Sequence, residues 1–169
     1  MKAVLGFYKT HPEAYVPKFE TEQAACFDFK ASLVDRETIV SYGWNNVLSN
    51  VDIIEDRTLV LEPAHRYLVP TNLIMDIPNK HSVRIHPRSG LSLKQGVTLF
   101  NCEGVIDSDY VNPVFIMLCN FTESEVTIKD GDRIAQGELV KLRSTKIHEI
   151  TSPPNHKTSR RGGFGSTGV

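Results

Sequence analysis

"EVTIKDGDRIAQ", residues 125–136, alternates apolar and polar side chains on both sides of Asp130-Gly131. Alternation with a period of two is typical of a strand with one buried face, and an Asp-Gly pair favours a tight turn because glycine accepts positive φ. We therefore predict two strands joined by a hairpin, with Asp132 and Arg133 as a surface ion pair. This stretch indicates a fold made of short strands.

The same kind of pattern recurs along the rest of the chain. Residues 82–87 alternate in the same way, and no long stretch sustains a period near 3.6. Residues 43–54 are the best candidate for a helix. The pattern predicts an all-β barrel or sandwich of jelly-roll type with little helix. Other short apolar runs, punctuated by Pro, Gly or Asn, occupy residues 58–63, 66–71, 72–78, 96–101 and 113–120.

Composition sets limits on the class of protein. The chain has 169 residues, a net charge of −1 and three scattered cysteines. This size predicts one compact domain, and the charge predicts no general affinity for nucleic acid or membranes. The longest apolar run, residues 114–118, is too short to cross a bilayer, and no signal-peptide pattern is found. We expect a cytoplasmic protein with reduced thiols.

The chain ends in "TSRRGGFGSTGV", residues 158–169. This segment is too polar and too rich in glycine to pack, which predicts a flexible tail after a β domain of residues 1–157. Arg160 and Arg161 can bind phosphate bidentately, and the glycines allow close backbone approach to an anion. Phe164 can stack on a planar base. The pattern favours a functional tail over simple disorder.

Two internal segments also carry polar groups suited to chemistry. "PRSGLS", residues 87–92, offers a guanidinium, a hydroxyl and a glycine amide in succession, which suits phosphate oxygens, although a solvated turn has the same composition. "NCEGVIDSDY", residues 101–110, places Asp107 and Asp109 on one face if it is a strand. Repulsion would then raise one pKa or attract a cation, giving a general base; the alternative is a solvated acidic turn.

Three further residues have both a functional and an ordinary interpretation. Asn101 could read a base edge or cap a turn, because its amide donates and accepts hydrogen bonds. Tyr110 could be a platform for a sugar or a half-buried aromatic. Gln136 becomes a candidate ligand only if its strand faces a bound molecule.

These segments, taken in order, resemble the signature motifs of the trimeric dUTPase family. "ACFDF" (residues 25–29) is similar to the first motif, and "PRSGLS", "NCEGVIDSDY", "GDRIAQ" and "GGFGSTG" (162–168) are similar to the other four. "LVPTNLIMDIP" (68–78) also looks like a strand pair of the family. The resemblance implies a distorted jelly roll (a β-clip barrel) and a homotrimer with active sites at subunit interfaces. It also implies hydrolysis of dUTP to dUMP and pyrophosphate.

The resemblance also implies roles for single residues. Asp107 would activate the water that attacks the α-phosphorus, and Asp28 would hold waters of a Mg²⁺ carried by the triphosphate. Ser89 would belong with these catalytic groups, and Tyr110 would pack under the deoxyribose. The residues implied to bind the phosphates are Arg88, Ser89, Gly90 and Gln136. Those implied to bind uracil are Asn101, Gly104, Val105 and Ile106. Those implied to bind substrate from the tail are Arg160, Arg161, Phe164, Gly165 and Ser166.

The chain departs from the family pattern at several points. Ser159 stands where the tail usually has arginine, so Arg160 or Arg161 would take over that contact. Cys26 replaces a glycine and would be strained if that position needs positive φ. Residues 111–113 read Val-Asn-Pro where the family prefers Arg-Gly-Glu. Residues 35–58 lengthen the link between the first two motifs, and we interpret them as a surface insertion.

Two alternative functions share this scaffold. A dCTP deaminase usually has Arg-Ser-Ser-x-x-Arg in the second motif and a glutamate in the strand after the third. Here Gly90, Leu93 and Met117 occupy the distinguishing positions, which disfavours deamination. The other alternative is a non-catalytic nucleotide-binding or regulatory protein. Such a protein would be free to lose Asp28 and Asp107, and both are present.

Overall fold

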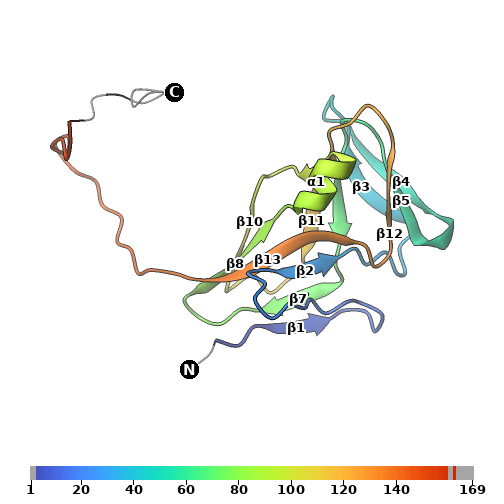
Figure 1. Ribbon diagram of the computed structural model, residues 1–169, viewed down its shortest axis with the longest axis horizontal. Coiled ribbons are helices and arrows are strands. Elements are labelled where there is room, and N and C mark those ends of the chain that lie inside the picture. The colour runs from blue at the N-terminus through green and yellow to red at the C-terminus, as the bar shows by residue number, and fades with distance from the viewer. Residues whose placement is uncertain (1–2, 160–161, 163–169) are drawn as a thin grey trace.

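A computed structural model describes residues 3–159 and residue 162, and it consists mainly of antiparallel strands (Figure 1). The sheets curl into a barrel-like body, so the all-β, distorted jelly-roll prediction is confirmed. The elements in chain order are β1 (Gly6–Lys9), β2 (Phe27–Lys30), β3 (Thr38–Tyr42), β4 (Leu48–Ile54), a 3₁₀ turn (Glu55–Arg57), β5 (Thr58–Leu61), β6 (Arg66–Pro70), β7 (Leu73–Asp76), β8 (His81–His86), α1 (Ser89–Gln95), β9 (Val97–Leu99), β10 (Gly104–Asp107), β11 (Phe115–Asn120), β12 (Val126–Lys129) and β13 (Arg133–Lys141).

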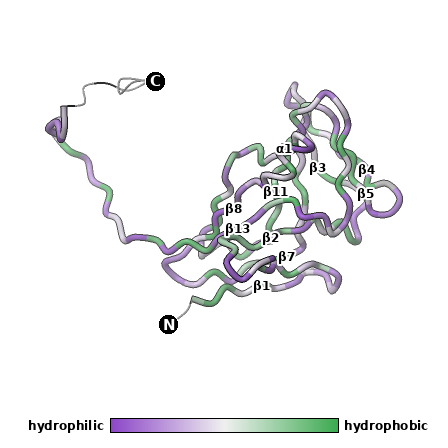
Figure 2. The backbone as a smooth tube through the Cα atoms, in the orientation of Figure 1, coloured by the Kyte–Doolittle hydropathy of each residue, from purple (hydrophilic) through white to green (hydrophobic). Residues whose placement is uncertain are grey.

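Three sheets enclose the core. The largest has the order β12-β5-β4-β3-β6-β11-β9, a second has the order β10-β8-β13-β2, and β1 pairs with β7. Green hydrophobic and purple hydrophilic segments alternate along much of the tube in Figure 2, as expected for strands with one buried face. The inward side chains are almost fully buried; they include Phe29, Leu61, Val69, Val83 and Leu118.

The predicted turn at Asp130-Gly131 exists, but the predicted hairpin is wrong. β12 pairs with β5, whereas β13 pairs with β2 and β8, so the two strands belong to different sheets. The Asp130 carboxylate fastens the turn by accepting hydrogen bonds from the Leu33 N–H and the Tyr15 hydroxyl, both at 2.7 Å. Gly131 adopts φ +84°, as an Asp-Gly turn requires. Long-range anchoring of this kind decides where a strand pairs, and the local alternation does not record it.

The expected Asp132–Arg133 ion pair is also absent from the contacts of the described residues. The Asp132 carboxylate accepts the Lys129 backbone N–H at 2.8 Å and so closes its own turn. Arg133 instead reaches Asp28 on β2. The reason is again the divergence of β12 and β13, which sends Arg133 toward the four-stranded sheet.

Residues 43–54 are not a helix. β3 and β4 form an antiparallel hairpin in which Ser41 pairs with Ser49 and their hydroxyls lie 2.7 Å apart. β3 also pairs with β6, and β4 pairs with β5, so the segment 35–58 contributes two strands to the large sheet. In β4, Val51 and Ile53 pack partly buried against the core while Asn50 and Asp52 are exposed, and this period of two explains why the strand forms instead of a helix. That the segment is an insertion relative to the family remains a prediction.

The main helix of the described chain was missed and lies in "PRSGLS" and the residues after it. α1 begins after Arg88 and ends at Gly96, which adopts φ +64°. Leu91 is buried against the core. At Gly96 a Cβ atom would lie 2.3 Å from the Thr122 side chain, so both the backbone conformation and the packing require glycine there. At seven residues, the helix is too short for periodicity to identify it.

The cysteine expectations can be checked against the structure. All three cysteines are free, as predicted. Cys26 is not among the residues with positive φ, so the condition under which it would be strained is not met. Among the three cysteines, the one with positive φ is Cys102, at φ +62°. None of the described helices is long and apolar enough to span a membrane.

Candidate active site

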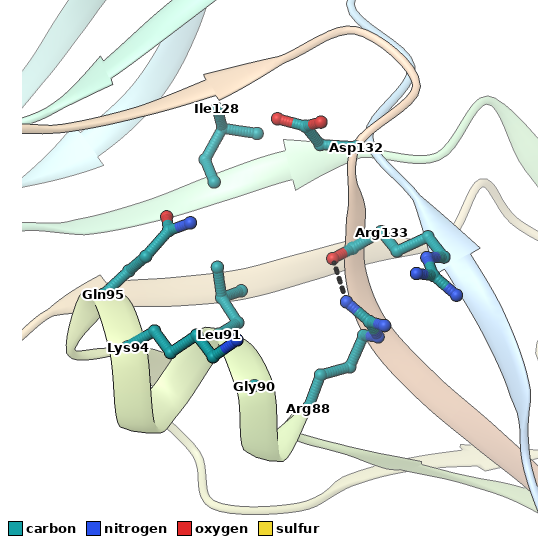
Figure 3. A pocket seen from close by; sticks show the side chains of 8 residues that line it. All are labelled: Arg88, Gly90, Leu91, Lys94, Gln95, Ile128, Asp132 and Arg133. Atoms are coloured by element: carbon teal, nitrogen blue, oxygen red, sulfur yellow. Dashed lines mark hydrogen bonds between the residues drawn. The ribbon is translucent and has the colours of Figure 1, made fainter.

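The structure brings Asp28 together with two arginines. Arg88 Nε donates to Asp28 Oδ1 and Arg133 Nη1 donates to Asp28 Oδ2, each at 3.1 Å. Arg88 Nη1 also donates to the Arg133 carbonyl oxygen at 3.0 Å (Figure 3). The Asp28 side chain is only 12 % exposed, so this ion-pair triad is partly withdrawn from water. Two guanidinium groups face one carboxylate in this triad, and Glu20 Oε2 lies 3.7 Å from Arg133 Nη1 at its edge. The guanidinium N–H groups suit an anionic ligand.

A hollow of about 320 Å³ opens beside these arginines. Three of its lining residues are cationic, namely Arg88, Lys94 and Arg133, and they come from α1 and the start of β13 (Figure 3). The lining also contains one carboxylate, Asp132, whose Oδ2 already accepts the Lys129 backbone N–H. The hollow can therefore accept a polyanion such as a phosphate chain. The remaining lining residues are Gly90, Leu91, Gln95 and Ile128.

Sequence reasoning missed two residues of this hollow. Lys94 lies in α1, which the sequence pattern does not predict; a helical spacing of four from Gly90 places the two residues on the same face. Arg133 was assigned to a surface pair with Asp132. The signal that could have identified Arg133 is long-range, because its partner Asp28 lies 105 positions away.

Two glycines near this site have different physical reasons. A Cβ atom added at Gly90 would meet nothing within 4 Å, so the fold itself does not require glycine there. A Cβ atom at Gly137 would lie 2.8 Å from the rings of both Phe27 and Phe29. Gly137 is thus a packing glycine, whereas Gly90 leaves open space beside the cationic hollow.

Gln136 lies in β13 between these elements. In the sheet register it is opposite both Asp28 on β2 and His86 on β8. Its Nε2 donates to the Pro87 carbonyl oxygen at 2.9 Å, directly before Arg88. Gln136 therefore lies beside the triad of Asp28, Arg88 and Arg133, where the predicted role of holding phosphates would place it. Ser89, at the first position of α1, is exposed.

The segment 101–110 forms a second, separate hollow. Asn101 lies in the turn between β9 and β10, is exposed, and makes no side-chain hydrogen bond with other residues in the described part of the chain. It joins Gly104, Val105 and Ile106 around a hollow of about 130 Å³. The other walls are apolar: Leu68, Ile85, Leu99, Phe115, Ile116 and Met117. An apolar slot with one free carboxamide suits a small planar ring that carries amide-like edges.

Asp107 ends β10, and its side chain is exposed. Asp109 lies in the following turn and outside the strand, so the predicted same-face pair of carboxylates is wrong. The turn is closed by the Tyr110 N–H, which donates to the Asp107 carbonyl oxygen at 3.1 Å. The Tyr110 hydroxyl donates to the Pro113 carbonyl oxygen at 3.0 Å. This bond fixes the ring, which remains 39 % exposed.

Within one chain Asp28 and Asp107 lie far apart. Asp107 lies on the edge strand β10, opposite Ser82 of β8. Asp28 lies on β2 at the other edge of the sheet, in register with Gln136 of β13 and His86 of β8. Three strand spacings of about 4.8 Å and four residue rises of about 3.3 Å separate the two positions, or about 20 Å in all. One phosphate chain cannot contact both carboxylates of the same chain.

The C-terminal segment leaves the body after β13. Residues 142–159 are exposed, and Figure 1 shows them running away from the sheets. The predicted tail residues Arg160, Arg161, Phe164, Gly165 and Ser166 lie outside the described residues. Among the described residues no group of three or more His, Cys, Asp or Glu side chains could hold a metal ion.

Comparison with known proteins identifies the family. The family model described as dUTPase matches residues 49–168. The chain belongs to the dUTPase family. The deoxyuridine 5'-triphosphate nucleotidohydrolase of Caulobacter vibrioides is 36% identical over 154 residues, which cover 91% of this chain and 86% of the relative. That of Brucella melitensis is 38% identical over 155 residues, which cover 91% and 85%.

Solved dUTPase structures share the fold. The Staphylococcus bacteriophage 80alpha dUTPase with dUPNHPP aligns with a TM-score of 0.72 at 19% identity, covering 98% of this chain and 99% of that one. The Streptococcus mutans dUTPase aligns with a TM-score of 0.64 at 23% identity, covering 83% and 98%. At these identities the structural match supports the jelly-roll architecture of the family.

Proposed function

We propose that this dUTPase-family protein hydrolyses dUTP to dUMP and pyrophosphate. The observation that carries the proposal is the presence of two complementary hollows: a cationic one at Arg88, Lys94 and Arg133, and a small apolar one with Asn101 at its edge. The first suits a triphosphate and the second suits a pyrimidine base. Relatives at 36–38% identity that carry the nucleotidohydrolase name support the same reaction.

The active site is composite in this proposal. Asp28 and Asp107 of one chain lie on opposite edges of the sheet. A complete site would therefore combine the phosphate-binding residues of one copy with the uracil hollow and Asp107 of another copy. A closed homotrimer with shared interfacial sites meets this need. The exposed segment 142–159 supports it further, because this part of the chain runs away from its own body.

Asp107 would act as the general base. Its carboxylate is exposed, and no side-chain hydrogen bond or ion pair occupies it within the described chain, so it is available to orient and deprotonate a water. In-line attack on the α-phosphorus would break the bond to the leaving pyrophosphate. Arg88 and Arg133 would exchange part of their contact with Asp28 for the phosphate oxygens and stabilise the charge that moves onto the leaving group. Ser89, Gly90 and Gln136 would hold the phosphates.

The residues present fit a magnesium ion that the substrate brings. Asp28 is a single carboxylate already paired with two arginines, so it suits contact through the water shell of the ion better than direct ligation. The ion would supply charge neutralisation on the triphosphate when bound. Asp28 is the residue of this chain that would hold its waters.

The base hollow disfavours deamination. Its lining contains Asn101 and apolar residues but no acidic side chain, and Met117 stands where a deaminase would need a glutamate. Tyr110, with its hydroxyl bonded to Pro113, would pack under the deoxyribose. The tail residues Arg160, Arg161 and Phe164 would close over the nucleotide, with Phe164 stacked on uracil.

A substrate panel tests the proposal. The purified protein is incubated with dUTP, dCTP, dTTP or UTP in the presence of Mg²⁺, and pyrophosphate and ammonia are measured separately. We expect pyrophosphate from dUTP and much less from the other nucleotides. Ammonia release from dCTP would establish a deaminase, and no product from any nucleotide would overturn the proposed hydrolysis.

A further inference from the structure

A network of arginine, histidine and glutamate side chains crosses the outer face of the four-stranded sheet. Arg84 Nη1 lies 3.0 Å from Glu103 Oε2, and His86 Nδ1 lies 3.7 Å from Glu103 Oε1. His86 Nε2 lies 3.3 Å from Glu138 Oε1. These four residues come from β8, from the turn before β10, and from β13. We call them the β8 charge network.

Glu103 lies in the same turn as Asn101, the polar residue at the edge of the base hollow. The Glu103 N–H donates to the Asn101 carbonyl oxygen at 2.6 Å, and the intervening Cys102 has φ +62°. Within the described chain, Glu103 is the only residue between Phe100 and Gly104 whose side chain makes an ion pair with the body. The carboxylate of Glu103 therefore holds this turn onto β8.

The other end of the network reaches the strand that carries Gln136. Glu138 follows Gln136 by two positions in β13, so both side chains project from the same face of the sheet. His86 is opposite Gln136 in the register and contacts Glu138. The network thus connects the turn that contains Asn101 to β13, the strand that carries Gln136 and lies beside the cationic hollow.

We infer that Arg84 and His86, acting through Glu103, are positioning residues that fix Asn101 for base recognition. This inference rests on the proposed function, since it concerns the affinity and base selectivity of the same site. Arg84 and His86 do not touch the nucleotide in this account. They hold the turn in the conformation that presents the Asn101 carboxamide to the ring.

The expected kinetic signature follows from the kind of contact that Asn101 makes. A hydrogen bond to the base is present in both the bound substrate and the transition state, so weakening it raises KM and leaves kcat nearly unchanged. A displaced carboxamide also distinguishes uracil from cytosine less well, because the two rings differ in the donors and acceptors of that edge. A general loss of folded protein would lower the apparent kcat for all substrates equally.

The test compares two glutamates that differ in place but have similar contacts. Glu103→Ala removes the hub of the network. Glu13→Ala is the matched control, because Glu13 is also a half-exposed carboxylate and accepts a hydrogen bond from Arg57 Nη1 at 2.6 Å. Glu13 lies outside the lining of both hollows. Steady-state kcat and KM for dUTP, kcat/KM for dCTP, and the thermal unfolding midpoint are measured for each variant.

We expect Glu103→Ala to raise KM for dUTP about five-fold, with kcat within two-fold of wild type and lower selectivity for dUTP over dCTP. Arg84→Ala should give the same pattern, Arg84→Lys should restore part of the affinity, and Glu13→Ala should match wild type. Unchanged KM and selectivity in both Glu103→Ala and Arg84→Ala would overturn the inference, as would a fall in kcat equal to the fall in kcat/KM. Lack of dUTP hydrolysis by the wild-type protein would instead overturn the proposed function.

Discussion

The phosphate hollow and the base hollow of this chain are prepared in different ways. At the phosphate end, Asp28, Arg88 and Arg133 already satisfy one another through bonds of 3.0–3.1 Å. At the base end, Asn101 and Asp107 are exposed and make no side-chain hydrogen bonds within the described residues. One chain therefore satisfies the side chains of its phosphate end internally, whereas the polar side chains of its base end are accessible.

The largest effect is expected at the base end, from Asp107→Asn. The change keeps the shape of the side chain and removes the base, so kcat should fall by about 100- to 10,000-fold while binding of a non-hydrolysable dUTP analogue stays nearly intact. Turnover assays and calorimetry measure the two quantities. Asp109→Asn is the matched control, since Asp109 is exposed two residues away and has no assigned role. Near-normal turnover of Asp107→Asn would refute the role of Asp107.

Deletion of residues 160–169 should have the next largest effect. The body makes its sheets and core without these residues, so we expect the same assembly by size-exclusion chromatography and the same unfolding midpoint. Activity should fall about 100-fold, because the phosphates and base lose the groups that close over them. Disassembly of the truncated protein would show that the tail is structural instead.

Arg133→Ala tests whether the internally paired arginine serves the substrate. A charge-assisted hydrogen bond is worth about 1.5–3 kcal/mol, so KM for dUTP should rise about ten-fold or more. Arg57→Ala is the control, because Arg57 pairs with Glu13 and lies outside the lining of both hollows. An unchanged KM for Arg133→Ala would mean that Arg133 serves only to neutralise Asp28.

The two glycines beside the phosphate end should respond in opposite ways. Gly137→Ala forces a Cβ against two phenylalanine rings and should lower the free energy of unfolding by about 1–3 kcal/mol. Gly90→Ala meets open space and favours the helix, so stability should change by less than about 1 kcal/mol while kcat/KM falls several-fold. Denaturant unfolding and steady-state kinetics separate the two outcomes. A stable, fully active Gly90→Ala variant would remove Gly90 from the phosphate site.

The smallest expected difference concerns thiols at the two ends. Burial raises the pKa of Cys26, and the nearby Glu138 and Asp28 carboxylates raise it further. A raised pKa leaves less thiolate at pH 8, so Cys26 should react with iodoacetamide more slowly than the exposed Cys102. Mass mapping after timed alkylation measures both rates. Faster labelling of Cys26 would show that the phosphate end is more open than the structure indicates.

Most strands could be predicted from the sequence, because alternation is a local property. The runs at 58–63, 66–71, 82–87 and 113–120 all overlap strands of the structure. The errors occurred where a distant contact decides the outcome. The hairpin at Asp130-Gly131 failed because Tyr15 and Leu33 anchor the turn elsewhere.

The sequence motifs identify most residues of the candidate site, but they do not predict which of those residues contact one another. The resemblance supplied Asp28, Arg88, Asn101, Asp107 and Gln136, but it gave no reason to include Arg133 as a partner of Asp28. Lys94 was missed because a seven-residue helix leaves no periodic signal long enough to read.

Where strands form and which chemical groups the chain offers can be read from the sequence, since both follow from the residues in a short window. Which of these groups meet depends on the tertiary fold. Arg88 and Arg133 reach Asp28 across 60 and 105 positions of chain, and Asp107 is kept about 20 Å away by the strand order. Strand pairing is set by burial of the whole core, and no local pattern records which distant strand will become a neighbour.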